Sequence, residues 1–223
     1  MKITEYNPKV TLVGVTQPRI EGVTSAQELI AYAARVSNPD NQMNKETAPK
    51  LLRYLANNRH WSPFEMVHVV MEIETTREIA RQILRHRSFS FQEFSQRYAT
   101  VDSLGMCFSE ARLQHATNRQ ASVEVDDDTL QREWEEIQRE LIDSAVTAYT
   151  WALDKGIAKE VARKALPEGN TMSRMYMSGS VRSWMHYILE RRQEGTQKEH
   201  RLVALHAQSA LLAEFTSLTE FFK

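Results

Sequence analysis

With 223 residues, the chain is long enough to bury a sizeable core in one domain. Its 42% hydrophobic and 26% charged residues exclude a largely disordered protein. The formal net charge of −1 excludes a generally basic nucleic-acid-binding surface, so any anion site must be local. The single cysteine excludes an internal disulfide. We expect a cytoplasmic protein, because no apolar run is long enough for a signal peptide or a membrane span.

The first half of the chain is predicted to alternate strands and helices. The helix over 26–36 begins with a capping box, in which Ser25 and Glu28 would each bind a backbone N–H. In 66–75, apolar residues at every second position predict a strand with one buried face. The elements in chain order are a strand at 9–16, helices at 26–36 and 47–58, a turn at 60–65, a strand at 66–75 and a helix at 76–87.

The second half is predicted to be mainly helical. The helix over 128–155 has the clearest period, because apolar residues recur every three or four positions and predict a core-facing stripe. This stripe consists of Leu130, Trp134, Ile137, Leu141, Ala145, Ala148 and Ala152. The elements are an extended stretch at 98–108, an irregular stretch at 109–126, helices at 128–155 and 158–166, a strand at 170–179 and helices at 180–193 and 197–214.

These elements predict a helix-rich α+β fold with a small, mainly antiparallel sheet, in a single domain that spans 1–223. The seven glycines include no G-x-G spacing, which excludes the glycine-rich dinucleotide and phosphate loops. Side chains would therefore have to hold the phosphates of any nucleotide. The histidines lack metal-ligand spacing, so we expect no metal site. Cys107 lies between Met106 and Phe108, which favours a buried apolar role over that of a nucleophile.

The most informative segment is RHRSFSFQEFSQR, from Arg85 to Arg97. It interleaves cations and serines with three phenylalanines, a mixture that suits neither a solvated face nor a core. Arginine forks suit phosphate, and aromatic surface suits flat rings. The residues alone leave two interpretations open: a site for a phosphate-bearing ligand, or a charged loop in which Glu93 pairs with Arg97.

A second group of cations follows between Arg163 and Arg191 and also includes Arg174. Arg182 and His186 are four residues apart and share a helix face. Arg191 follows Arg182 by nine residues and points to roughly the opposite side of the helix. These side chains are therefore either surface charges or parts of two different sites at a subunit interface, to which the same helix contributes residues.

The segment resembles the signature R-H-R-x-x-S-x-N-x-x-S-x-R of the flavin-dependent thymidylate synthases. Six positions match, and Gln92 stands where that family usually has Asn. The matching positions are Arg85, His86, Arg87, Ser90, Ser95 and Arg97. The resemblance extends to His60-x-x-Pro63-Phe64-Glu65, to Arg81-Gln82 and to the 163–191 group, so it spans about 60–192.

The resemblance implies reductive methylation of dUMP to dTMP, with methylenetetrahydrofolate as carbon donor, FAD as hydride carrier and NADPH as reductant. It implies a homotetramer with active sites at subunit interfaces. It also implies that Arg191 is catalytic and stabilises negative charge on the uracil ring, a role suited to a side chain that stays protonated. No cysteine would attack uracil, and Ser95 would be a dUMP ligand, not a nucleophile.

By position, the resemblance implies two sets of binding residues. Those for FAD are Ser62, Arg85, His86, Arg87, Glu93, Ser180, Arg182 and His186. Those for dUMP are Gln82, Arg85, Glu93, Phe94, Ser95, Gln96, Arg97, Arg163 and Arg191, with Ser95 and Arg97 at the phosphate. Ser180 and His186 stand where the family commonly has Asn, although both can hydrogen-bond a flavin.

Three other functions remain open from the sequence. The basic and aromatic segment 85–97 could stack single-stranded bases in a nucleic-acid-binding module. Its charges could instead pair across an oligomer in an assembly protein. A flavin enzyme of the same fold could also act on another nucleotide, an alternative that Gln92 keeps open.

Overall fold

A four-stranded antiparallel sheet with the strand order β2–β3–β8–β4 forms the centre of the structure, a computed structural model that describes residues 1–223. The four strands are β2 (Lys9–Val15), β3 (His68–Thr76), β4 (Ser90–Glu93) and β8 (Met172–Ser180). Strand β8 pairs with β3 along its whole length, from Met172 opposite Thr76 to Ser180 opposite His68. The predicted strands at 9–16, 66–75 and 170–179 are therefore confirmed.

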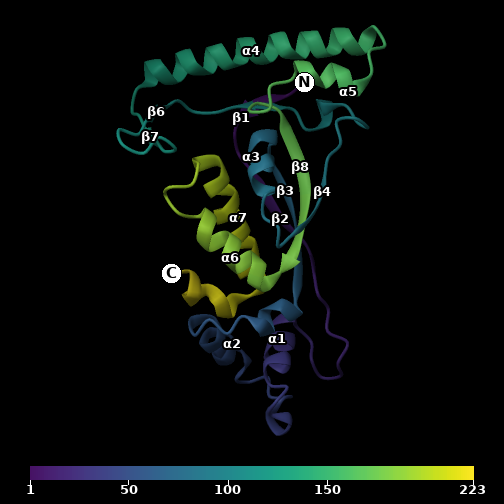
Figure 1. Cartoon of the computed structure of the whole chain (residues 1–223), viewed down its shortest axis with the longest axis vertical. Coiled ribbons are helices and arrows are strands. Elements are labelled where there is room, and N and C mark those ends of the chain that lie inside the picture. The colour runs from purple at the N-terminus through teal and green to yellow at the C-terminus, as the bar shows by residue number, and fades with distance from the viewer.

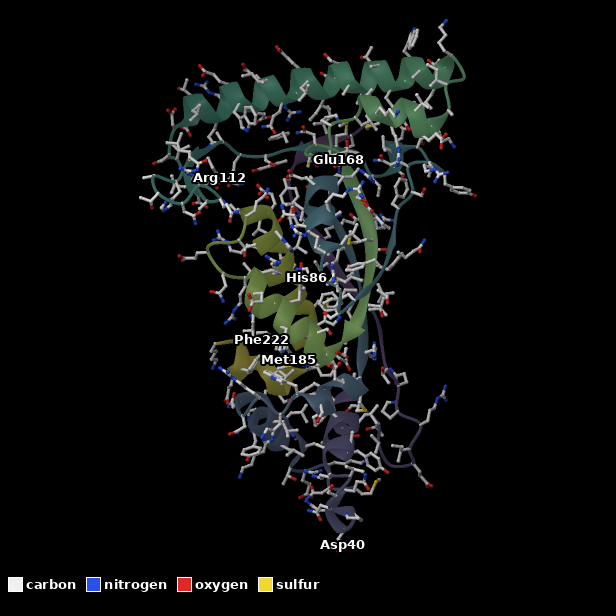
Figure 2. The ribbon with its side chains drawn as sticks, viewed as in Figure 1. Asp40, His86, Arg112, Glu168, Met185 and Phe222 are labelled. Atoms are coloured by element: carbon white, nitrogen blue, oxygen red, sulfur yellow. The ribbon has the colours of Figure 1, made fainter.

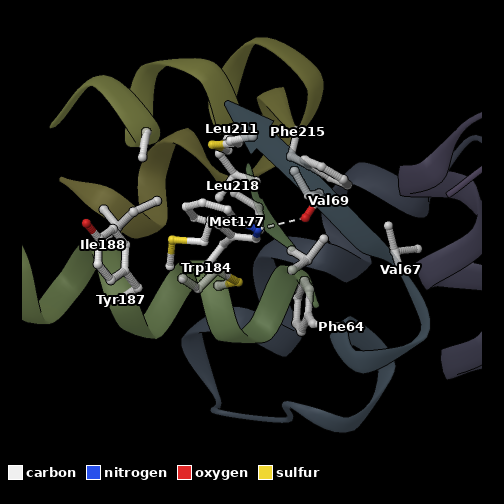
Figure 3. Close-up of a cluster of buried hydrophobic side chains, with 14 of the residues drawn as sticks. Phe64, Val67, Val69, Met177, Trp184, Tyr187, Ile188, Leu211, Phe215 and Leu218 are labelled. Carbon is white, nitrogen blue, oxygen red and sulfur yellow. Dashed lines mark hydrogen bonds between the residues drawn. The ribbon is translucent and has the colours of Figure 1, made fainter. Parts of the chain in front are cut away.

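Three helices cover one face of this sheet (Figure 1). They are α3 (Arg77–Ile83), α6 (Val181–Arg191) and α7 (Lys198–Glu214). Alternation in β3 explains the packing, because Val69, Met71 and Ile73 are fully buried beneath the helices while Glu72 and Glu74 face the other way. The indole of Trp184 on α6 lies in this core and donates from Nε1 to the Val69 carbonyl over 3.1 Å (Figure 3).

The N-terminal helices and the C-terminus close one end of the molecule (Figure 1). Helix α1 (Ala26–Ala34) packs on α2 (Ala48–Asn57), and α2 packs on the final 3-10 helix, Thr216–Phe222. The predicted capping box is present, because Ser25 accepts from the Glu28 N–H and the Glu28 carboxylate accepts from the Ser25 N–H. The predicted turn at 60–65 forms a short 3-10 helix, Ser62–Met66, that joins this end to β3.

The long helix α4 (Asp128–Asp154) lies across the opposite end (Figure 1). It packs on α5 (Lys159–Ala162), on the 3-10 turn Arg163–Ala165 and on β5 (Met106–Phe108), and a smaller core cluster lies beneath it. Strand β5 pairs in parallel with β1 (Ile3–Glu5). The two remaining strands, β6 (Arg112–Gln114) and β7 (Ser122–Glu124), form a hairpin.

Two sequence predictions in this end of the molecule are wrong. The stretch 109–126 is not wholly irregular, because it contains the β6–β7 hairpin. The core-facing stripe of α4 is only partly buried: Trp134, Ile137 and Leu141 keep 40%, 57% and 52% of their surface exposed, and Ala148 is exposed as well. The buried face is rotated from the predicted one and consists of Gln138, Ile142, Ala145, Tyr149 and Ala152. The helix thus carries two neighbouring stripes, and the chain itself covers only one of them.

The remaining elements agree with the helix-rich α+β prediction. The helices expected at 158–166, 180–193 and 197–214 are present, while the helix expected at 76–87 ends earlier, at Ile83. The extended stretch at 98–108 includes a 3-10 turn, Val101–Ser103, before β5. None of the helices combines the length and the apolar character that a bilayer crossing requires.

Candidate functional site

The segment 85–97 is a turn followed by an edge strand, anchored by its phenylalanines. Phe89 packs edge-on against Trp184, with the ring centroids 4.9 Å apart, and it covers Gly179 on the neighbouring strand. Strand β4 then pairs with β8, placing Gln92 opposite Tyr176 with its side chain exposed. Phe89 therefore holds the backbone on the core, while the three arginines of the segment are exposed.

The three cations at the start of the segment have different surroundings. Arg85 and Arg87 are exposed, and neither side chain makes an ion pair or a hydrogen bond to protein. His86 between them is half-buried, and its Nε2 accepts from Nε of Arg191 over 3.0 Å. Burial, followed by the charge of Arg191, lowers the pKa of His86, so the ring is neutral near pH 7 and can accept. The contact joins two predicted site residues that are far apart in the sequence.

Glu93 is held by residues that the sequence analysis did not select. Its Oε1 accepts from the Ser173 hydroxyl over 2.8 Å and from Nη1 of Arg77, which is 7% exposed, over 3.4 Å. The alternative in which Glu93 pairs with Arg97 is wrong, because Arg97 instead lies 3.4 Å from Glu160 at the surface. A pairing within one segment looks plausible from spacing alone, but β4 directs Glu93 toward α3 and β8.

A cationic pocket of about 280 Å³ lies between α3 and the turn that follows α5. It contains two predicted dUMP residues, Gln96 and Arg163. Gln96 is 3% exposed, and its Nε2 has no hydrogen-bond partner in the protein, so a buried donor is available to a ligand. Four cations and one carboxylate make the pocket attractive to an anion. Its lining residues are Arg77, Arg81, Gln96, Arg163, Lys164, Leu166 and Glu168.

A third group of predicted residues surrounds the start of α6. Ser180 caps this helix by accepting from the Ser183 N–H, and Arg182 donates from Nη1 to Glu65 over 2.7 Å. Burial raises the pKa of Glu65, but the hydrogen bonds from Ser180 and Arg182 outweigh it and leave that pKa lowered. The Nε of Arg182 is buried without a partner.

His186 and Ser62 complete this third group. His186 packs edge-on against Trp61 with the ring centroids 4.7 Å apart, and burial, followed by the charge of Arg182, lowers the pKa of His186. Ser62 begins the neighbouring 3-10 helix and is exposed. This group therefore offers neutral rings and hydroxyls beside one incompletely paired guanidinium.

Gln82 lies in a polar network that the sequence analysis missed. Its amide contacts Gln197 and His200 at the start of α7, and His200 also contacts the hydroxyl of Tyr187. His200 shares a helix face with the buried residues Val203, Ala207 and Leu211, and this period was the one available signal that it is buried. Nothing in the sequence indicates that it would meet Gln82.

Within one chain, the predicted site residues form three separate groups. The cationic pocket lies near Glu168, the His86 contact lies further along the sheet, and the Arg182 group lies beyond it, beside Met185 (Figure 2). The two arginines of α6 have different neighbours, since Arg182 binds Glu65 and Arg191 binds His86.

Two further observations limit the chemistry. Cys107 is buried in β5, and burial, with the charges of Glu78 and Glu199, raises the pKa of its thiol to about 12, which confirms the predicted apolar role. No cluster of three or more histidine, cysteine, aspartate or glutamate side chains could hold a metal ion.

Comparisons with known proteins agree with one another. Residues 20–215 match the model of the family described as thymidylate synthase complementing protein. The probable flavin-dependent thymidylate synthase of Paramecium bursaria Chlorella virus 1 is 47% identical over 209 residues, which cover 94% of this chain and 96% of that protein. The flavin-dependent thymidylate synthase of Synechocystis is 46% identical over 212 residues, with the same coverage.

A solved structure shares the fold along almost the whole chain. The UMP/dUMP methylase PolB from Streptomyces cacaoi, bound with 5-Br dUMP, superposes with a TM-score of 0.81 at 25% identity, covering 98% of this chain and 97% of that one. The family match, the two relatives and the shared fold all extend over the segments that carry the three groups of site residues. The chain therefore belongs to the family of the flavin-dependent thymidylate synthases.

Proposed function

We propose that this protein catalyses the reductive methylation of dUMP to dTMP, with methylenetetrahydrofolate as carbon donor, FAD as hydride carrier and NADPH as reductant. The observation that carries the proposal is the contact between Arg191 and His86, which lie 105 positions apart. It joins the arginine-rich signature segment to the arginine proposed to act on uracil. We also propose that 1–223 forms one domain and that the enzyme works in the cytoplasm, where its nucleotide and reduced co-substrates are used.

The residues proposed to hold FAD are suited to that cofactor. Arg85 and Arg87 are exposed cations without protein partners, which suits the binding of a diphosphate. The unpartnered Nε of Arg182 provides a buried donor. When bound, FAD supplies the hydride of the reaction. The remaining proposed FAD residues are Ser62, His86, Glu93, Ser180 and His186.

The cationic pocket around Arg163 is proposed to receive the phosphate of dUMP. Its excess of positive charge and the free Nε2 of Gln96 support this assignment. Ser95 and Arg97 are exposed beside it, and Arg97 is held only by a surface ion pair that a phosphate could replace. The other proposed dUMP residues are Gln82, Arg85, Glu93, Phe94 and Arg191.

Arg191 is proposed to polarise the uracil ring. Nε2 of His86 accepts from the Nε–H of Arg191, so both terminal NH₂ groups remain available to the carbonyl oxygens of uracil. Arginine stays protonated, so it can stabilise the negative charge that develops as the ring becomes nucleophilic. Cys107 is buried, and we therefore assign no covalent attack on uracil to a cysteine.

A homotetramer with active sites at subunit interfaces is proposed for two reasons. Arg182 binds Glu65 while Arg191 binds His86, so the two arginines of α6 have different neighbours, as expected if one helix contributes to two sites at an interface. Helix α4 also exposes apolar side chains at successive spacings of three, four, seven and three residues, which places them on one stripe that could pack on another helix. This stripe, which we call the α4 seam, consists of Trp134, Ile137, Leu141, Ala148 and Trp151.

The absorption spectrum of the purified protein, followed by assay, tests the proposal. We expect a flavin band at roughly 450 nm that bleaches with NADPH and shifts when dUMP is added. Incubation with methylenetetrahydrofolate and NADPH should then convert dUMP to dTMP, identified by chromatography. UMP should be assayed in parallel, because the similar PolB is described as a UMP/dUMP methylase. A colourless protein that binds oligonucleotides in a salt-dependent way would contradict the proposal.

A further inference from the structure

Gln82 belongs to a series of side-chain hydrogen bonds that links Gln197, His200 and Tyr187. Its Nε2 donates to Oε1 of Gln197 over 2.7 Å, and its Oε1 lies 3.2 Å from Nδ1 of His200. The other ring nitrogen of His200, Nε2, lies 3.1 Å from the hydroxyl of Tyr187. Both ends of the Gln82 amide are therefore in contact with side chains of the protein.

The Glu199 carboxylate, at one end of this series of hydrogen bonds, determines which atoms donate and which accept. Gln197 donates from Nε2 to Oε2 of Glu199 over 3.0 Å. Glu199 is buried, and its other oxygen accepts from Nη2 of Arg112 over 2.6 Å, so it is an ion-paired acceptor. Gln197 must therefore turn its NH₂ toward Glu199 and its Oε1 toward Gln82. Gln82 can then hydrogen-bond to Gln197 only by donating from its own NH₂ group.

The orientation of Gln82 in turn sets the tautomer of His200. His200 is 1% exposed, and burial, with the charges of Arg191 and His86, lowers its pKa to about 3, so it carries a single ring proton near pH 7. Oε1 of Gln82 can only accept, so the ring proton of His200 lies on Nδ1, which donates to that oxygen. Nε2 of His200 then accepts from the hydroxyl of Tyr187, which keeps its proton because burial raises its pKa.

We propose that His200 and Gln197 are positioning residues that fix the orientation of the Gln82 amide for the nucleotide. The inference rests on the proposed function, because it takes Gln82 as a dUMP ligand. Each end of an amide can make two hydrogen bonds, so one N–H and one acceptor position of Gln82 remain for the nucleotide. An amide that is already oriented loses less freedom on binding than one that rotates. His200 thus acts through Gln82 without touching the nucleotide.

A double-mutant cycle on the FAD-loaded enzyme tests this coupling. The dissociation constant of dUMP is measured by calorimetry for the wild type, His200→Leu, Gln82→Ala and the double variant. We expect His200→Leu to weaken dUMP binding about tenfold when Gln82 is present, the effect of one lost hydrogen bond, and to change nothing further in the Gln82→Ala background. A general structural effect would weaken binding by the same factor in both backgrounds, and that result would overturn the proposal.

A control and a second variant keep the result decisive. His206 is on the same helix and its Nδ1 lies 3.0 Å from the Pro8 carbonyl, so His206→Leu removes a comparable contact and should leave dUMP binding unchanged. If His200→Leu fails to fold, Gln197→Met removes the other partner of Gln82 and should show the same dependence on Gln82. Gln197→Met effects that are equal in both backgrounds would reject the inference.

Failure of the inference can be distinguished from failure of the proposed function. If the FAD-loaded wild type does not bind dUMP, the proposed function is wrong and the inference is wrong with it. If the wild type binds dUMP but the effect of His200→Leu does not depend on Gln82, the positioning role alone is wrong.

Discussion

Arg191, the last residue of α6, donates from Nε to Nε2 of His86 over 3.0 Å. The acceptor must be a neutral imidazole with its proton on Nδ1, because a guanidinium only donates. The bond orients the guanidinium through its inner nitrogen and leaves its outer nitrogens for a ligand. Arg191, from the second group of cations, is thereby held by His86, the second residue of the signature segment.

The first prediction concerns turnover. Arg191→Ala should lower the turnover of dUMP on the order of a hundredfold or more, because it removes a charge that would act on the uracil ring as negative charge develops. Arg192→Ala is the matched control, since Arg192 binds Gln208 and the Phe222 carbonyl and not His86. Steady-state assays of both variants with flavin bound provide the measurement. If Arg191→Ala kept near wild-type turnover, the catalytic role proposed for Arg191 would be wrong.

The second prediction concerns the titration of His86. Burial is the larger cause of its lowered pKa and Arg191 is the second, so Arg191→Ala should raise the pKa without restoring the ordinary value of 6.5. Histidine resonances followed by NMR across pH 4 to 8 provide the measurement, roughly bracketing that value. Arg192→Ala should leave the pKa of His86 where it is in the wild type. A pKa of His86 that is identical in wild type and Arg191→Ala would show that the contact is absent in solution.

The sequence predicted most elements because their local patterns were sufficient. Alternation identified β3, and the capping box located the start of α1. The error in α4 has a physical reason. The helix has two neighbouring apolar stripes, and periodicity does not say which stripe its own chain covers and which remains exposed.

The sequence identified several candidate site residues, but it did not show which other side chains they contact. The family resemblance selected Arg85, His86 and Arg191, to which we assign roles in binding and catalysis. The partners that orient site residues, such as Arg77 for Glu93 and His200 for Gln82, come from distant segments. Only the pairing of strands and the packing of α7 on α3 bring them together.

The third prediction uses a glycine beneath the signature segment. A Cβ built on Gly179 would lie 2.5 Å from Cδ1 of Phe89, so Gly179→Ala must displace the ring that anchors the segment. We expect a loss of about 1–3 kcal/mol in the free energy of unfolding. Gly14→Ala is the matched strand control, because its Cβ would meet Val70 at an ordinary 3.9 Å. Urea unfolding compares the two, and equal losses would contradict the predicted clash.

The fourth prediction is the pH dependence of stability at His200. Its pKa in the folded protein, about 3, lies below the ordinary value of 6.5, so the unfolded chain binds the extra proton first. The stabilisation from neutral His200 is complete above pH 6.5 and is lost as pH falls toward 3. The stability advantage of wild type over His200→Leu should therefore shrink by up to ~1.4 kcal/mol per pH unit within that window. A difference that stays constant from pH 7 to about 4.5 in urea unfolding would refute it.

The fifth prediction concerns assembly through α4. Leu141, 52% exposed at the centre of the α4 seam, should lie against another copy of the chain, so Leu141→Lys should place an unpaired charge in that interface. We expect the variant to sediment as a smaller species than the wild type in analytical ultracentrifugation. Asp143→Lys is the control, because Asp143 is exposed and lies roughly 200° around the helix from Leu141. If Leu141→Lys sedimented like the wild type while Asp143→Lys did not, the interface would lie on the other face of α4.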